Sequence, residues 1–162
     1  MKQVKEKRAP MKLIGKSVRT NNAKEYNKND GLIFPLVIGY FQGQMMDQIP
    51  RRKTPGTTYC CYTDYESDYN GDYTYFIGEE VSDTSDVPEG FQVLDIPEQT
   101  YVKYTTPPEP MPDVLTNAWK YIWDSSEEKM GGKRNYLTDF EVYDERASDH
   151  SKIVMDICIG IS

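Results

Sequence analysis

The sequence predicts an α+β fold with two similar halves, each built in the order strand, helix, strand, strand. Strand-like alternation and helical periodicity follow this order over residues 11–82 and follow it again over residues 91–162. An acidic connector with proline and glycine, residues 83–90, separates the two segments. The two closing hairpins also match in sequence, because each turn carries a Ser-Asp pair, at 67–68 and 148–149. This repeat predicts a pseudo-twofold pair of βαββ units with antiparallel sheets, two main helices and a central ligand groove at their junction.

The first half is expected to begin with a strand over residues 11–20. A polar loop then leads to Asp30, which we expect to cap a helix over residues 32–49. Pro35 fits the first turn of this helix, and Pro50 ends it. Apolar residues at helical spacing predict its buried face: Phe34, Ile38, Phe41, Met45 and Ile49.

The second half repeats this plan. A strand-like segment over residues 91–106 is interrupted at Pro97, and a stiff, proline-rich link follows it. A helix is predicted from Asp113 to about residue 128, with a glycine pair at 131–132 ending it. Its apolar side is expected to contain Val114, Leu115, Ala118, Trp119 and Trp123, with either Tyr121 or Ile122.

Each half is expected to close with a β-hairpin. In the first half, strands over residues 57–64 and 72–82 are joined by an Asn-Gly turn, a strong hairpin signal. In the second half, the hairpin strands are predicted over residues 139–146 and 152–161.

Charge is distributed unevenly along the chain of 162 residues, which carries a net charge of −7. Residues 1–16 contain six basic side chains and one acidic side chain, Glu6. We interpret residues 1–10 as a flexible basic N-terminus and residues 11–162 as the folded domain. Because the rest of the chain is acidic, we expect cationic partners and no direct contact with nucleic acid.

Residues typical of metal sites and cofactor motifs are scarce. The three cysteines, Cys60, Cys61 and Cys158, form no CxxC pair and are accompanied by a single histidine, His150, so we predict neither a metal nor a cofactor. There is no signal-peptide pattern and no apolar run long enough for a membrane span, so we expect a cytoplasmic protein without a membrane partner.

Glu141 is the strongest candidate for a ligand-binding residue. It lies in the alternating stretch Asp-Phe-Glu-Val-Tyr at residues 139–143, which places Glu141 and Tyr143 on one face of a strand. The chain contains 13 tyrosines, 5 phenylalanines and 2 tryptophans. Aromatic faces attract organic cations, and a carboxylate neutralises their charge where water is scarce. The alternative is a strand whose polar side faces solvent.

Aromatic residues on other elements could complete such a site. Trp119 and Trp123 lie on one stripe of the second helix, and Phe41 lies at a comparable place on the first. Tyr59 and Tyr62 belong to the tyrosine-rich first hairpin, where aromatic faces and hydroxyls could line an amphipathic pocket. The alternative is that these residues form ordinary core and exposed strand surface.

Four segments resemble the GyrI-like effector-binding superfamily, and within it the stand-alone, integron-associated effector-binding proteins. They are residues 62–73, 88–90, 119–123 and 139–146, and the resemblance extends over residues 11–162. The resemblance implies two βαββ halves with a groove that binds lipophilic cations, as in the ligand domains of bacterial multidrug-binding transcription regulators.

The resemblance also suggests roles for individual residues. Glu141 matches the ligand-binding glutamate of the family, and Tyr143, Trp119 and Trp123 match the neighbourhood of the pocket. Asp156 matches a position at which regulators of the family can carry a second acid.

These observations lead to one hypothesis and two alternatives. We expect a sensor or sequestering protein that binds an amphipathic organic cation, with Glu141 as the counter-charge and an aromatic enclosure formed by Phe41, Tyr59, Tyr62, Trp119, Trp123 and Tyr143. The first alternative, which the resemblance implies, is a hydrolase of strained electrophiles in which Glu141 and Tyr143 are catalytic. The second, also implied by the resemblance, is a protein-interaction module with a protein partner, such as a topoisomerase inhibitor.

Overall fold

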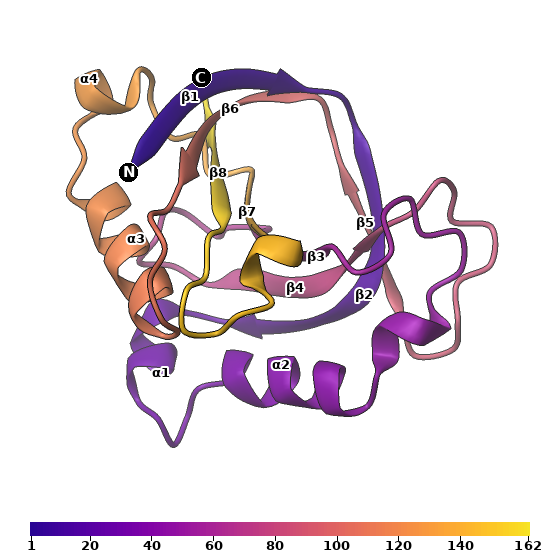
Figure 1. Ribbon diagram of the computed structural model, residues 1–162. Helices are drawn as coiled ribbons and strands as arrows, with labels where there is room; N and C mark the ends of the chain where they lie inside the picture. The colour runs from indigo at the N-terminus through magenta and orange to yellow at the C-terminus, as the bar shows by residue number, and fades with distance from the viewer.

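The computed structural model describes residues 1–162 as a single curled antiparallel sheet of eight strands with helices on its outer face (Figure 1). The first half contains the following elements: β1 (Lys2–Arg8), β2 (Met11–Thr20), α1 (Asn22–Tyr26), α2 (Ile33–Gln42), β3 (Thr58–Thr63) and β4 (Tyr73–Glu80). The second half contains β5 (Gln92–Ile96), β6 (Gln99–Thr105), α3 (Asp113–Trp123), α4 (Glu127–Met130), β7 (Thr138–Tyr143) and β8 (Asp156–Ile161). Its four strands and α3 are the counterparts of the four strands and α2 of the first half. The predicted α+β fold is therefore confirmed.

The order of the strands shows the pseudo-twofold relation between the halves. Across the sheet the order is β1-β6-β8-β7-β3-β4-β2-β5. When each strand is exchanged for its counterpart in the other half, β1 for β5 and so on, the same order is read from the opposite edge. The axis of this symmetry passes between β3 and β7, which pair antiparallel at the centre.

Each half has one more strand than the sequence analysis predicted. Residues 2–8, expected to be a flexible N-terminus, instead form β1 and pair with β6 along their length. Gln3 Nε2 also donates to the carbonyl of Lys129, at 2.8 Å. This strand was missed because lysines on a sheet edge remain in solvent while the backbone pairs, so no hydrophobic pattern marks it.

The strand-like segment over residues 91–106 is two strands, β5 and β6, which are separated near Pro97. The strand β5 pairs with β2, whereas β1 pairs with β6. Each half thus contributes its first strand to the edge of the other half, which ties the two halves into one sheet.

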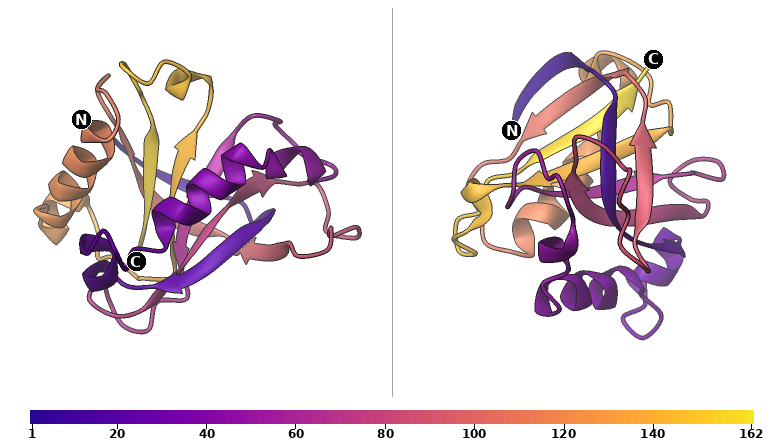
Figure 2. Two further views of the ribbon diagram at one scale, coloured as in Figure 1. Left: turned by 90° about the horizontal axis from the view of Figure 1, so that it is seen from below. Right: turned by 90° about the vertical axis from the view of Figure 1, so that its right-hand side faces the viewer.

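The two faces of the sheet carry different layers. On the outer face, α3 packs through Val114, Ala118 and Ile122, and α2 packs through Tyr40. The inner face of the curl has its own core, which contains Leu13, Tyr59, Phe76, Tyr101, Phe140, Val142 and Cys158. Figure 2 shows the curl of the sheet, and the helices outside it, from two further directions. No helix in this fold has both the length and the apolar character needed to cross a bilayer.

The buried face of α2 differs from the one that its spacing predicted. Phe34 and Phe41 are 73% and 46% exposed, whereas Tyr40 is fully buried. Nearly every residue of α2 is apolar, so periodicity does not select one face of this helix. The helix is also shorter than expected and begins after Leu32 rather than Asp30. The Glu25 carboxylate accepts hydrogen bonds from the backbone N–H groups of Leu32 and Ile33 at this end.

The predicted second helix is divided in two. The first part, α3, ends at Trp123, and a short α4 begins at Glu127 with Ser126 as its N-cap. Gly131 ends α4 with a positive φ of 84°, which glycine adopts without strain.

Candidate functional site

Glu141 lies near the centre of the outer face of the sheet, close to the pseudo-twofold axis. In the register of β3 and β7 it is paired with Cys60. Its neighbours Phe140 and Val142 belong to the inner core, so Glu141 and Tyr143 point toward the helices. Strand parity predicted these pairs, and the structure adds which face each occupies. The side chain of Glu141 is 1% exposed.

Three side chains donate hydrogen bonds to the Glu141 carboxylate. The hydroxyl of Tyr62 and Nε1 of Trp119 both donate to Oε2, each at 2.7 Å. The hydroxyl of Tyr143 donates to Oε1 at 2.8 Å. Burial raises the pKa of Glu141, and these three hydrogen bonds partly oppose that rise. The carboxylate is therefore well hydrogen-bonded, but none of its partners carries a positive charge.

Aromatic rings surround the hydrogen-bonded group. The ring of Tyr62 meets that of Trp119 edge-on, with centroids 5.1 Å apart, and lies 5.6 Å from the ring of Tyr73. The ring of Trp123 lies 6.0 Å from that of Trp119 on the next turn of α3. These rings separate the carboxylate from solvent.

A cavity of about 160 Å³ opens beside these rings. Its wall combines residues of both halves: Asn22, Glu25, Ile33, Tyr62, Tyr65, Tyr69, Tyr73, Trp119, Trp123 and Arg134. All but Arg134 come from α1, the start of α2, the first hairpin and α3, which meet near the lower left of Figure 1. The cavity is smaller than the clefts of roughly 300–1,000 Å³ that hold drug-sized ligands. A ligand of that size therefore requires the aromatic side chains to move apart.

Most of the residues predicted for the site are brought together here. Tyr62, Trp119 and Trp123 line the cavity, and the first two also contact Glu141. Tyr143 reaches the same carboxylate from the next outward-facing position on β7. These five residues, from β3, β7 and α3, form one connected cluster.

Tyr59 and Phe41 lie elsewhere. Tyr59 is paired with Val142 on the inner face, where its ring packs edge-on against Phe140 at 5.8 Å. Phe41 lies on the exposed side of α2, with its ring nearly perpendicular to that of Tyr40. Neither residue lines the cavity, so neither is retained as a ligand contact.

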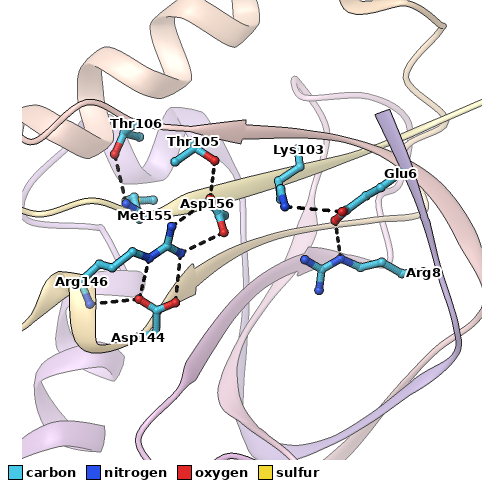
Figure 3. Close-up of polar contacts among 9 residues, drawn as sticks. All are labelled: Glu6, Arg8, Lys103, Thr105, Thr106, Asp144, Arg146, Met155 and Asp156. Carbon is cyan, nitrogen blue, oxygen red and sulfur yellow. Dashed lines mark hydrogen bonds and ion pairs between the residues drawn. The ribbon is translucent and has the colours of Figure 1, made fainter. Parts of the chain in front are cut away.

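Asp156 also lies away from the cavity, because its neighbour Ile157 shares the face of Glu141. Figure 3 shows Asp156 between Thr105, whose hydroxyl donates to Oδ1 at 2.6 Å, and Arg146, whose Nη2 donates to Oδ2 at 2.9 Å. Burial alone would raise the pKa of Asp156, but the hydrogen bonds from Arg146 and Thr105 lower it. This acid already has its cation and is not free to neutralise another.

Two charged cavity residues were not expected from the sequence. Glu25 comes from α1, and Arg134 comes from the loop before β7, where Nη2 donates to Asp139 Oδ2 at 2.7 Å. The hydroxyl of Tyr65 donates to the same oxygen, also at 2.7 Å. No local pattern marks either residue, because both lie in polar segments that only the tertiary fold brings beside the aromatic rings.

Comparisons with known proteins agree with this architecture. A family model described as integron-associated effector binding protein matches residues 6–161. The putative transcriptional regulator protein YobU of Bacillus subtilis (strain 168) is 25% identical over 150 residues, which cover 93% of this chain and 91% of YobU.

Two solved structures have the same fold over nearly their whole length. An integron cassette protein from the mobile metagenome of Vibrio cholerae is 23% identical with a TM-score of 0.75, over 99% of this chain and 95% of that one. SAV2435 bound to tetraphenylphosphonium is 13% identical with a TM-score of 0.79, over 100% of this chain and 94% of that one.

Proposed function

Because the chain belongs to the family of integron-associated effector binding proteins and has the GyrI-like fold, we propose that it binds amphipathic organic cations over the aromatic cluster. In this proposal Glu141 supplies the counter-charge, and Tyr62, Trp119 and Trp123 supply the ring surfaces. Binding would serve sensing or sequestration linked to transcription regulation.

The observation that carries this proposal is a buried carboxylate without a cation. Taking a charge out of water is costly unless it is paired, and Glu141 has only the neutral donors of Tyr62, Trp119 and Tyr143. An organic cation on the rings supplies the missing charge. Rings attract such a cation within about 6 Å of the ring centroid.

The relatives support the ligand class and the biological setting. SAV2435 has this fold and is described as bound to tetraphenylphosphonium, a lipophilic cation. YobU is described as a putative transcriptional regulator. We extend the ligand class and the regulatory setting to this chain as parts of the proposal.

The contacts of Glu141 favour a binding role over hydrolysis. Both carboxylate oxygens already accept hydrogen bonds from side chains, and the carboxylate lies behind Tyr62 and Trp119, which form the cavity wall. A general base must reach a water molecule beside the substrate. For water to reach the carboxylate, the rings of Tyr62 and Trp119 would have to move apart, as they would for a cation. Hydrolysis would then also require a substrate placed beside that water, whereas cation binding requires nothing more.

A thermal-shift titration tests the proposal. Tetraphenylphosphonium should raise the melting temperature progressively, because a ligand at a hundred times its Kd stabilises the folded state by about 2.7 kcal/mol. Tetraphenylborate, an anion of the same shape, should give no shift through this site. Equal shifts for both ions would reject the counter-charge role, and the absence of a shift for a panel of organic cations would reject the function.

A further inference from the structure

A second cavity adjoins the first on the side of α4. Its volume is about 270 Å³, and it shares Tyr69, Trp123 and Arg134 with the cavity beside Tyr62. The rest of its wall comes from the turn between β3 and β4, from the end of α3, from α4 and the residues that join it to α3, and from the loop before β7. A ligand that rests on Tyr62 and Trp119 could therefore extend past Trp123 into this second space.

The shared residue Arg134 has unused hydrogen-bond donors. Its side chain is 10% exposed, and its single hydrogen bond to a side chain runs from Nη2 to Asp139. Its Nε is buried without any partner. The guanidinium lies over the ring of Tyr136, with the central carbon 4.4 Å from the ring centroid, which holds its plane in place. Buried donors without acceptors are costly, so a ligand acceptor that reaches Arg134 gains a hydrogen bond at a position fixed in advance.

The charges around the second cavity indicate what kind of acceptor fits. Lys133 and Arg134 are balanced in its wall by Asp68 and Glu127. Arg134 is in addition already neutralised by Asp139. With no excess of positive charge, the site offers N–H donors without attracting an anion, which favours a neutral oxygen acceptor.

Building on the proposed cation-binding function, we propose that the second cavity is a subsite for a neutral carbonyl oxygen carried by the same ligand as the cationic group. The cationic group would rest on the rings beside Glu141, and the carbonyl would accept a hydrogen bond from Arg134. The ligand class is thus an elongated organic cation with an amide or ketone at some distance from its charge.

Matched triphenylphosphonium probes test this subsite by calorimetry. Each probe carries one alkyl chain that ends either in a primary amide or in an alkyl group of the same size, in a series of chain lengths. At the best length the amide probe should bind about tenfold more tightly than its alkyl partner, as expected for a hydrogen bond from a charged donor.

Two arginine variants show whether Arg134 provides the gain. Arg134→Lys keeps a positive charge beside Asp139 but removes the guanidinium fork, so the ratio of the two affinities should fall to about one. Arg146→Lys changes an arginine that is paired with carboxylates away from the cavity, and it should retain the full ratio. If Arg134→Lys does not fold, the double variant Arg134→Met with Asp139→Asn removes both charges and should show the same loss.

The outcomes separate the subsite from the function on which it rests. Tight binding of the alkyl probe without a gain for the amide would overturn the subsite alone, and so would a gain that survives in both Arg134 variants. A carboxylate-ended probe that binds tenfold more tightly than the amide would overturn the choice of a neutral acceptor. Failure of both probes to bind would overturn cation binding, and the subsite with it.

Discussion

Replacing Glu141 with glutamine tests the counter-charge directly. The change keeps the size of the side chain and removes its charge. The amide oxygen can still accept from Tyr62 and Trp119, and the amide NH2 group can donate to the hydroxyl oxygen of Tyr143 in place of the bond that Oε1 accepts. A cationic ligand should therefore bind much more weakly to Glu141→Gln. A neutral ligand of the same shape should bind nearly as well as before.

The size of the loss follows from the position of the carboxylate. The Tyr62 hydroxyl lies 2.7 Å from Oε2, so a cation on the face of this ring has its charge roughly 6 Å from the carboxylate. At an effective dielectric constant of about 20, two unit charges at that distance attract by about 2.8 kcal/mol. Each 1.4 kcal/mol is about a tenfold change in Kd, so the cation should lose about a hundredfold in affinity.

The assay needs a ligand pair that differs only in charge. The meta-hydroxyphenyl trimethylammonium ion and meta-tert-butylphenol have the same shape and are both soluble. Their affinities should be measured by calorimetry for the wild type and for Glu141→Gln. Glu79→Gln is a matched control, because Glu79 is equally buried but already has Arg52 as its cation, with Nη1 3.2 Å from Oε2. This control should leave both affinities unchanged.

If Glu141→Gln lowers the affinities for the ammonium ion and for the phenol by the same factor, the counter-charge role of Glu141 is refuted. That result would mean that Glu141 shapes the cavity through its hydrogen bonds and not through its charge. A loss of cation affinity in Glu79→Gln would instead point to the overall acidity of the protein.

Two further predictions concern protons. Burial raises the pKa of Glu141 above its usual value of 4.5, and a bound cation favours the ionised form. Cation affinity should therefore increase as the pH rises through the pKa of the free protein, and binding within that pH range should release a proton. Calorimetry across a pH series in buffers of different ionisation enthalpy should show both effects, and heats independent of the buffer at every pH would contradict them. Tyr143→Phe removes the only hydrogen-bond donor to Oε1, which favours the ionised form, so it should move the increase in cation affinity to higher pH. The control Tyr59→Phe, on the inner face, should leave the pH profile unchanged. Identical profiles for the wild type and both variants would exclude this role of Tyr143.

The sequence was sufficient to predict the repeated architecture and the alternation around Glu141. Both rest on local patterns that the fold preserves, namely the period of each strand and the order of the elements. The face that Glu141 occupies could not be predicted in this way. It depends on the pairing of β7 with β3, which sets Cys60 opposite Glu141 across a long separation in the chain.

The missed features have related physical causes. The edge strand β1 carries charged residues that stay in solvent, so no apolar period reveals it. In α2 nearly every residue is apolar, so the period is present but does not indicate which side is buried. Asp156 was assigned to the site by resemblance, and the register places its neighbour Ile157 on the face of Glu141 instead.

The pseudo-twofold axis explains why a symmetric fold has one acidic centre. Positions 60 and 141 are paired across this axis, where cross-strand Cβ atoms lie about 4.5–5.5 Å apart. Two buried carboxylates at that distance would repel each other strongly and could not both be ionised, so only one of the two equivalent positions can hold a charge. The other holds the small side chain of Cys60, which packs with Tyr40 from α2. One half therefore has an apolar contact at this position, while the other has an unpaired carboxylate that accepts a hydrogen bond from Trp119 of α3. The counter-charge for the proposed cation thus lies on the α3 side of the axis.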